Sequence, residues 1–253
     1  MTRLVVLQHL EPEGPGLFAA EAGRRGWPIQ IVRLDQGDAL PRLEPDDLLL
    51  VLGGPMGVAD VGNPAYPWLA GEVELLRQAL ARQQPLIGVC LGAQLLALAA
   101  GGTAIPLQVG DPPQPLREVG FGAISWCVDP AQDPATAQLL RGLAASELVL
   151  HWHGDRCVLP RQAELLASSL HCPEQAFRIG ARAVGLQFHV ELLPEQLELW
   201  LRHDRDYVIG ALGAGGVERI RADGRRWGAQ VARQGERLIA NLLDLLTADL
   251  VGR

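Results

Sequence analysis

The turn Gly88-Val89-Cys90-Leu91-Gly92 constrains the fold most, because it joins an apolar strand directly to a helix. Residues 84–89 form a short apolar run with a proline near its start, as a buried strand does. Residues 93–100 are rich in good helix formers, and two glycines follow them that can end a helix. Glycines on both sides of Cys90 permit a sharp turn that pushes the cysteine side chain outward. The sequence therefore predicts a strand, a tight turn carrying Cys90, and a helix.

Two interpretations of Cys90 are open from this turn alone. A thiolate at a helix N-terminus lies near unpaired N–H groups and the positive end of the helix dipole, which favour the charged, nucleophilic form. A single cysteine between apolar residues is also commonly a buried structural residue. His171 and Cys172 form another histidine–cysteine pair, but neighbours on a strand point to opposite faces and no glycine turn surrounds them. Cys90 is thus the better candidate nucleophile, provided that a base lies elsewhere in the chain.

A histidine and a glutamate follow the predicted strand at 183–188. His189 and Glu191 are two residues apart, and side chains at that spacing in extended chain point to the same side. A general base and the carboxylate that orients it need this placement. The spacing therefore predicts that Glu191 orients His189.

A glycine turn follows a third apolar strand, predicted over 47–52. The turn Gly53-Gly54-Pro55 can direct a backbone N–H at a developing oxyanion, and the N–H of Leu91 can do the same. These three stretches supply a nucleophile, a base with its partner, and oxyanion donors.

Together the three stretches resemble the class I (triad) glutamine amidotransferases. Gly53-Gly54-Pro55, Gly88-x-Cys90-x-Gly92-x-Gln94 and Phe188-His189-Val190-Glu191 occur in the order of that family, and the resemblance covers roughly residues 3 to 192. It is strongest to stand-alone proteins that are similar to the glutaminase domain of GMP synthase.

The resemblance implies a role for each matching residue. Cys90 matches the family nucleophile, His189 the base and Glu191 the orienting carboxylate. The N–H groups of Gly54 and Leu91 match the oxyanion-hole donors. Gln94 matches a residue that contacts the substrate glutamine.

The stretch His151-Trp152-His153-Gly154-Asp155 has three interpretations. Two histidines and an aspartate could bind a metal, but this spacing on what we expect to be irregular chain is weak evidence for one. The side chains could instead make ordinary hydrogen bonds. The family resemblance favours a third interpretation, in which His153 and Asp155 shape the substrate pocket and no metal is bound.

Composition narrows the class of protein. A chain of 253 residues with 48% hydrophobic residues suits an α/β domain with a large core, and the formal charge of −7 disfavours nucleic acid as a partner. The four cysteines lack the spacing of a disulfide framework or zinc site, which favours a reducing, cytoplasmic location. The apolar start at residues 4–7 is too short for a signal peptide or a membrane span.

Alternating strands and helices predict a flavodoxin-like, mostly parallel sheet with helices on both faces. Ligands of such sheets bind at the carboxyl ends of the strands, where all three motifs lie. Residues 105–115 are expected to form a surface loop. We expect residues 1–192 to form the amidotransferase domain. Residues 193–253 are expected to form a helical extension on it, with helices over 194–208 and 219–251 separated by a glycine-rich break.

The resemblance implies a glutaminase-type hydrolase that needs no cofactor and cleaves a γ-glutamyl amide through a Cys90 thioester. Two alternatives stay open: a γ-glutamyl peptide or γ-glutamyl amine as substrate, and a non-catalytic regulatory protein on the same fold. Amidotransferases of this class deliver ammonia to a synthetase. The sequence contains no glycine-rich phosphate loop, so any synthetase is expected to be a separate partner.

Overall fold

The first half of the chain alternates strands and helices, and its strands pair in parallel. The computed structural model describes residues 1–248. Its parallel strands lie in the order β2-β1-β3-β4-β13. Their bounds are β1 (Arg3–Gln8), β2 (Ile29–Arg33), β3 (Asp47–Val51), β4 (Leu86–Val89) and β13 (Ala183–Leu186). Because helices cover both faces, β3 and β4 are buried at every residue, as their continuous apolar runs predict.

The second half of the chain extends the same sheet with antiparallel strands. They continue beyond β13 in the order β12-β11-β8-β9, which gives nine strands in all. Their bounds are β8 (Glu118–Trp126), β9 (Ser146–His153), β11 (Ala163–Ser168) and β12 (Ala176–Ile179). The predicted α/β fold, with its parallel strands and helices on both faces, is confirmed, and the antiparallel strands extend it on one side.

The segment expected to be a loop at 105–115 is partly extended. Strand β5 (Thr103–Pro106) pairs with β10 (Asp155–Val158), and β6 (Gln108–Val109) pairs with β7 (Gln114–Pro115). Prolines conceal such short strands from sequence analysis, although an edge strand tolerates them.

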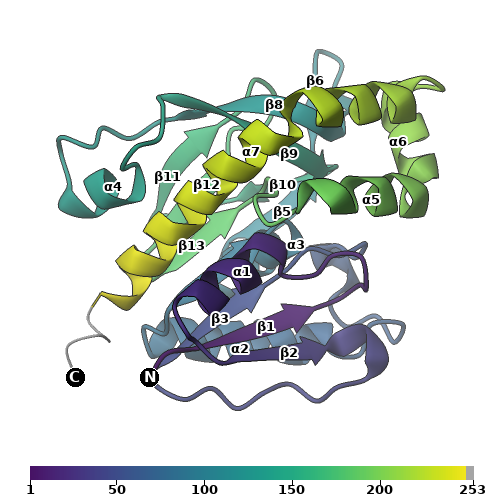
Figure 1. The fold of residues 1–253 in the computed structure, drawn as a ribbon. Coiled ribbons are helices and arrows are strands. Elements are labelled where there is room, and N and C mark those ends of the chain that lie inside the picture. The colour runs from purple at the N-terminus through teal and green to yellow at the C-terminus, as the bar shows by residue number, and fades with distance from the viewer. Residues whose placement is uncertain (249–253) are drawn as a thin grey trace.

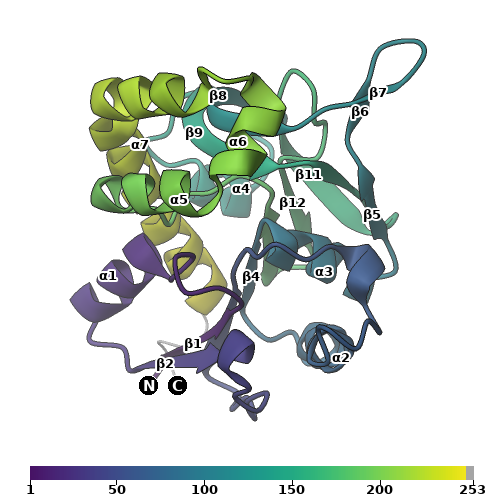
Figure 2. The same ribbon diagram turned by 90° about the vertical axis from the view of Figure 1, so that its right-hand side faces the viewer.

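Two layers of helices cover the parallel strands (Figure 2). On one face lie α2 (Leu69–Ala81) and α3 (Leu91–Ala99), and on the other lie α1 (Gly16–Arg24) and the long α7 (Gly216–Thr247). Alternate residues of β1 enter the two cores: Leu4 and Val6 pack with α1 and α7, whereas Val5 and Leu7 pack with α2. Short elements connect these layers: η1 (Leu34–Gln36), η2 (Val58–Asp60), α4 (Pro134–Leu139) and η3 (Pro194–Gln196).

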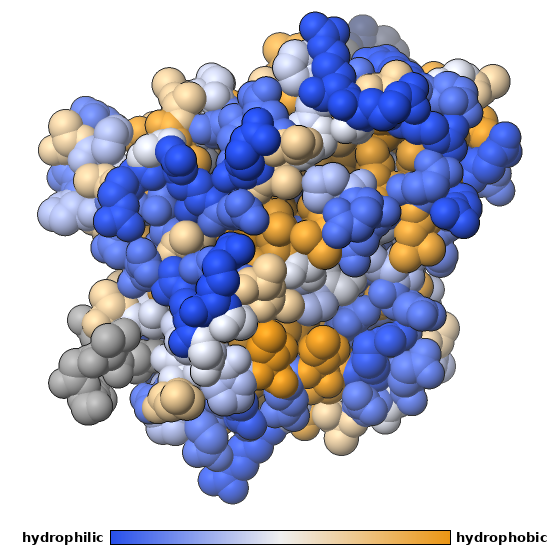
Figure 3. All heavy atoms as spheres, in the orientation of Figure 1, coloured by the Kyte–Doolittle hydropathy of each residue, from blue (hydrophilic) through white to orange (hydrophobic). Residues whose placement is uncertain are grey.

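The C-terminal segment is helical, as predicted, but it breaks earlier than expected. The helix predicted over 194–208 ends at His203 as α5 (Leu197–His203), and α6 (Arg205–Leu212) follows it directly. Helix α7 runs diagonally across the sheet beside α1 (Figure 1), and its apolar stripe is buried against the core. Its outward face is largely hydrophilic (Figure 3). The predicted end of this helix, 249–251, lies outside the described residues, among which no helix is long and apolar enough to cross a membrane.

Candidate active site

Cys90 occupies the turn between β4 and α3, where the sequence places it. Its backbone has φ of 52° and ψ of −109°, in the left-handed region that L side chains rarely adopt. The Cys90 N–H donates to the carbonyl oxygen of Leu186 at 2.7 Å, which fixes the turn to β13. A methyl group on Gly92 would collide with the backbone of Val51, so only glycine lets α3 approach the sheet this closely. The Cys90 residue is only 7% exposed and faces an enclosed cavity.

His189 and Glu191 lie just beyond the end of β13 and contact each other. His189 Nδ1 lies 2.6 Å from Oε1 of Glu191, and both residues are buried. The other carboxylate oxygen accepts the N–H of Val190 at 2.9 Å, so the carboxylate cannot swing away. The His189 ring packs edge-on against Trp200 of α5, with ring centroids 4.8 Å apart. The contact predicted from the i, i+2 spacing is therefore formed, and a tryptophan from the extension clamps the ring.

The electrostatics of His189 suit a group that takes up a proton. Burial alone would lower its pKa, but the Glu191 carboxylate and the neighbouring Cys90 thiol raise it well above the usual value. Because a carboxylate only accepts, Nδ1 must carry the proton shared with Glu191. The buried Nε2 has no hydrogen-bond partner among residues 1–248, so it is free to exchange a proton with a reacting group.

A second histidine–glutamate pair holds the Gly53–Gly54 peptide. His9 Nδ1 lies 2.9 Å from the carbonyl oxygen of Gly53, and His9 Nε2 lies 3.0 Å from Oε1 of Glu72. Both oxygens are acceptors, so the imidazole donates from both nitrogens and carries a positive charge. Burial alone would lower the pKa of His9, but the Glu72 carboxylate raises it. The pair therefore fixes the direction of the Gly53 carbonyl.

That carbonyl sets the direction of the next N–H. In a trans peptide the N–H points opposite to the C=O, so the Gly54 N–H points away from His9. It donates to no other group within the described part of the chain. The Leu91 N–H begins α3 and has no acceptor within the helix. Gly54 and Leu91 both line the cavity beside Cys90, which leaves two backbone donors available there.

These groups open onto one cavity of about 590 Å³, a size typical of small-molecule sites. Its walls come from both halves of the sheet and from the C-terminal helices α5 and α6. Among the lining residues are Leu10, Glu13, Gly54, Met56, Cys90, Leu91, Gln94, Arg117, Trp152, His153, Asp155, His189, Asp204 and Tyr207.

A family model for class I glutamine amidotransferases matches residues 17–201, well over half of the chain. The chain belongs to this family. It is 29% identical to the glutamine amidotransferase-like protein YfeJ of Salmonella typhimurium, over 90% of this chain and 91% of that protein. It is 34% identical to a glutamine-hydrolysing GMP synthase of Porphyromonas gingivalis, over 56% of this chain but only 26% of that longer protein. A glutamine amidotransferase from Thermotoga maritima superposes with a TM-score of 0.77 at 26% identity, covering 98% of this chain and 97% of that one.

In this amidotransferase the three residues expected to bind substrate all line the cavity. Gln94 is buried, and its Nε2 donates to Oε1 of Gln187 at 3.3 Å. His153 is also buried, and its Nδ1 donates to the carbonyl oxygen of Asp155 at 2.9 Å. Burial raises the pKa of Asp155, and the nearby His153 partly offsets that rise. All three side chains therefore lie in the cavity that holds Cys90.

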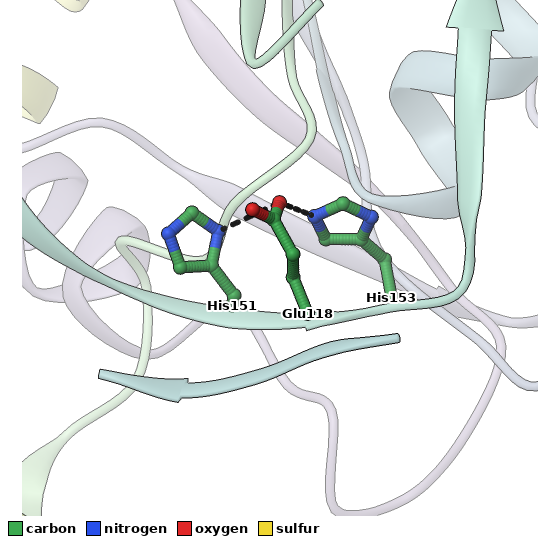
Figure 4. Close-up of side chains that lie close together, drawn as sticks. All are labelled: Glu118, His151 and His153. Atoms are coloured by element: carbon green, nitrogen blue, oxygen red, sulfur yellow. Dashed lines mark ion pairs between the residues drawn. The ribbon is translucent and has the colours of Figure 1, made fainter. Parts of the chain in front are cut away.

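One expectation about this stretch is wrong. His151 and His153 lie within strand β9, not on irregular chain, so both point to the same side of the sheet. Glu118 of β8 lies between them (Figure 4), with its Oε2 3.8 Å from His151 Nδ1 and 3.1 Å from His153 Nε2. The tryptophan and glycine in this stretch concealed the strand, which the antiparallel partner β8 stabilises.

The Glu118 cluster has ligand atoms within 4.8 Å of one another, as a metal site would. The carboxylate is already hydrogen-bonded, however: Oε2 also accepts from Gln175 at 2.6 Å, and Oε1 accepts from Ser169 at 2.7 Å. Burial would raise the pKa of Glu118, but hydrogen bonds led by that from His153 lower it. Burial lowers the pKa of His151 to about 4, so that ring is neutral. We interpret the cluster as a network that supports the His153 turn from behind.

Sequence reasoning missed several residues of this amidotransferase site. His9 and Glu72 support the Gly53–Gly54 peptide, and Glu13 reaches the cavity from the loop after β1. Asp204 and Tyr207 come from the extension. The sequence does show a histidine and a glutamate close behind the first strand, where α/β sheets bind ligands, and that signal could have found His9 and Glu13.

Proposed function

We propose that this protein hydrolyses a γ-glutamyl amide, glutamine in the simplest case, through a thioester on Cys90. The observation that carries the proposal is the meeting of three groups in one cavity. These are a cysteine on a strand-to-helix turn, a histidine paired with a glutamate at 2.6 Å, and two unpaired backbone N–H groups. Membership of the class I amidotransferases supports the same chemistry.

In the first half of the reaction, Cys90 attacks the γ-carbonyl carbon and His189 Nε2 accepts the thiol proton. The carbonyl oxygen becomes an oxyanion, which the N–H groups of Gly54 and Leu91 stabilise. The C–N bond then breaks, and His189 returns the proton to the departing nitrogen. Glu191 keeps the imidazole in position and stabilises its charged form throughout.

In the second half, a water molecule replaces the amine. His189 removes a proton from the water as its oxygen attacks the thioester carbon, and the same two N–H groups stabilise the second oxyanion. The C–S bond breaks, and the proton returns to the sulfur. The products are glutamate and ammonia, or glutamate and an amine. These steps require no metal or organic cofactor.

The other cysteines are poorer nucleophiles. Burial raises the pKa of both the Cys157 and Cys172 thiols, so each stays protonated. Cys127 is exposed and lies outside the cavity. The γ-glutamyl peptide or amine alternative keeps the same steps with a larger leaving group. A non-catalytic role is less favoured, because the cavity retains a complete set of reacting groups.

A glutamine-like electrophile, such as a diazoketone analogue of glutamine, tests the proposal. We expect it to label Cys90 alone in peptide mass mapping, and to be excluded by excess glutamine or by a γ-glutamyl amide. Purified protein should also release free glutamate from at least one γ-glutamyl compound, and Cys90→Ser should not. Label on Cys172 or Cys127 with Cys90 unmodified would overturn the assignment.

Location and partners belong to the same proposal. Free cysteines such as Cys90 and Cys127 favour a cytoplasmic protein. Relatives include glutamine-hydrolysing GMP synthases, among them one from Ignicoccus hospitalis in which the glutamine-hydrolysing part is a separate chain. That arrangement favours a synthetase partner in trans as one possibility to test. We further propose residues 1–192 as the amidotransferase domain, with residues 193–253 as an extension that completes its cavity wall.

A further inference from the structure

Glu13 is a buried carboxyl that the reaction above does not use. It lies on the loop between β1 and α1, is 8% exposed and lines the cavity. Within the described residues, no hydrogen bond or ion pair joins its carboxyl group to another side chain or to the backbone. A buried carboxyl without a partner destabilises the folded state, so its presence calls for an occupant of the cavity.

The loop holds this carboxyl in a defined place. The Trp200 indole N–H donates to the carbonyl oxygen of Pro12 at 2.9 Å, directly before Glu13 in the chain. The Gln8 side-chain amide donates to the carbonyl oxygens of Leu10 at 2.9 Å and Glu11 at 3.1 Å. The loop is thus fixed from both sides, which preorganises Glu13 for binding.

Glu13 lies on the leaving-group side of the site. Its carboxyl occupies the space next to Gly53, where a Cβ would also lie 3.2 Å from His189 Cε1 and 3.5 Å from Cys90 Cβ. The leaving nitrogen must face His189, because His189 returns the proton to it. Glu13 therefore lies beside the path of the departing amine.

A second carboxylate lies in the same part of the cavity. Asp204 accepts the indole N–H of Trp152 at 2.8 Å, and its negative charge acts on Glu13. Asp155 and Arg117 come from the strands on the other side of the cavity and carry opposite charges. That pair matches the α-ammonium and α-carboxylate of a γ-glutamyl group. Glu13 and Asp204 are left without a counterpart in glutamine itself.

We propose that Glu13 and Asp204 form a subsite for the leaving amine, and that they select γ-glutamyl amides whose amine carries a second, positively charged nitrogen. This inference rests on the proposed function and names its substrate class. Ammonia or an amine released there would also be held as a cation until it leaves.

The protonation of Glu13 agrees with such an occupant. Burial raises its pKa to about 7, His189 and His9 act to lower it, and Glu191 and Asp204 act to raise it further. A cation bound beside the carboxyl would favour the charged form. The empty subsite is thus close to half protonated at neutral pH, and an arriving ammonium group ionises it.

Three γ-glutamyl amides that differ at the distal end of the amine test the subsite: those of 1,4-diaminobutane (cationic), n-pentylamine (neutral) and 4-aminobutanoate (anionic). With glutamate release as the readout, we expect kcat/KM for the cationic amide to exceed that for the neutral one by at least about tenfold. The anionic amide should be the poorest substrate. In Glu13→Gln the cationic-to-neutral ratio should fall by about tenfold or more, and in Asp204→Asn it should fall less.

Glu11→Gln is the matched control, because Glu11 is exposed on the same loop, and it should keep the wild-type ratio. Asn at 204 still offers an acceptor to Trp152. A wild-type preference for the neutral or anionic amide would overturn the proposal. An equal loss on all three amides in Glu13→Gln would also overturn it, because it would place Glu13 against the γ-glutamyl half.

A binding measurement separates this proposal from the proposed function. If no amide and no glutamine is hydrolysed, the proposed function fails. Calorimetric titration of the same proteins with free 1,4-diaminobutane and n-pentylamine still tests the subsite. We expect wild type to bind the diamine at least about tenfold more tightly than the monoamine, and Glu13→Gln to bind both equally. Equal binding of the two amines by wild type would refute the subsite.

Discussion

The Nδ1 of His9 and the carbonyl oxygen of Gly53 are 2.9 Å apart, and Glu72 holds the other ring nitrogen at 3.0 Å. Because the Gly54 N–H points opposite to this carbonyl, a residue that does not contact the reacting atoms sets the direction of a proposed oxyanion donor. His9 is a positioning residue in this account. It acts only through the peptide that it holds.

The first prediction concerns that peptide. His9→Phe should lower kcat for glutamine by about 10²–10³, the loss typical of one oxyanion donor, with little change in KM. In His9→Asn, the amide nitrogen can take the place of Nδ1 and still donate to Gly53, so we expect most of the kcat to return. Combining each variant with Glu72→Gln removes the unpaired buried charge. If both variants lose KM and kcat together, the role of His9 is only structural.

The second prediction separates the roles of the histidine–glutamate pair. His189→Ala should lose nearly all activity, because no other cavity group is placed to carry the proton. Glu191→Gln should retain more activity, since the imidazole remains but is less well oriented and less stabilised when charged. Steady-state glutamate release by both variants checks this, with circular dichroism to confirm folding. Persistent activity in both variants would contradict the proposed triad.

The third prediction follows from the pKa of Glu13. In the folded state this carboxyl keeps its proton up to about pH 7, whereas an unperturbed glutamate releases it near 4.5. Between these values the folded protein binds more protons, so this group reduces the free energy of unfolding as pH rises. Glu13→Gln lacks that loss and should gain stability over wild type, by up to roughly 3 kcal/mol at pH 8 compared with pH 4.5.

Urea denaturation at both pH values measures this difference, and the exposed Glu11→Gln should show no such gain. A Glu13→Gln variant whose relative stability does not change with pH would mean that Glu13 is already ionised in the folded protein.

The fourth prediction concerns the close contact behind Cys90. Gly92→Ala would bring a methyl group into the Val51 backbone, and we expect it to lower the free energy of unfolding by about 1–3 kcal/mol or more. Gly23→Ala in α1 is the control, because no atom lies within 4 Å of the added methyl group. Removing that helical glycine should stabilise the protein by about 0.5–1 kcal/mol. Equal melting temperatures for the two variants would contradict the packing described here.

The sequence predicted those parts of the site that depend on local pattern. Glycines around Cys90 and the two-residue spacing of His189 and Glu191 are local signals, and the structure brings these side chains to one cavity. Contacts between distant segments left no such signal. His9 reaches Gly53 across 44 residues, and Trp200 reaches Pro12 across 188.

Strand β9 was underestimated for a related reason. A strand stabilised by pairing with β8 along its whole length can include His151 to His153, although their composition does not resemble a strand. The break between α5 and α6 was missed as well, because residues 197–208 carry apolar residues at helical spacing throughout.

The last prediction concerns regulation by a partner. A glutaminase that serves a synthetase should be slow alone, because unregulated hydrolysis wastes glutamine, and it needs a surface for that partner. The apolar stripe of α7 could have been such a surface. Leu238, Ile239 and Leu242 are instead buried in the core with α1, and the outward face of the helix is largely hydrophilic (Figure 3).

We therefore expect the purified chain to be fully active on its own γ-glutamyl substrate. Addition of cell extract should change its kcat/KM by less than about twofold, since the buried stripe offers no apolar docking surface. Kinetics of glutamate release with and without extract measure this, and heat-treated extract is the control. Strong stimulation of glutamine hydrolysis by a heat-sensitive protein fraction would instead show that a partner in trans completes or opens the site. The α7 stripe could not be the surface that binds it, because exposing that stripe would open the core that holds α1 against the sheet.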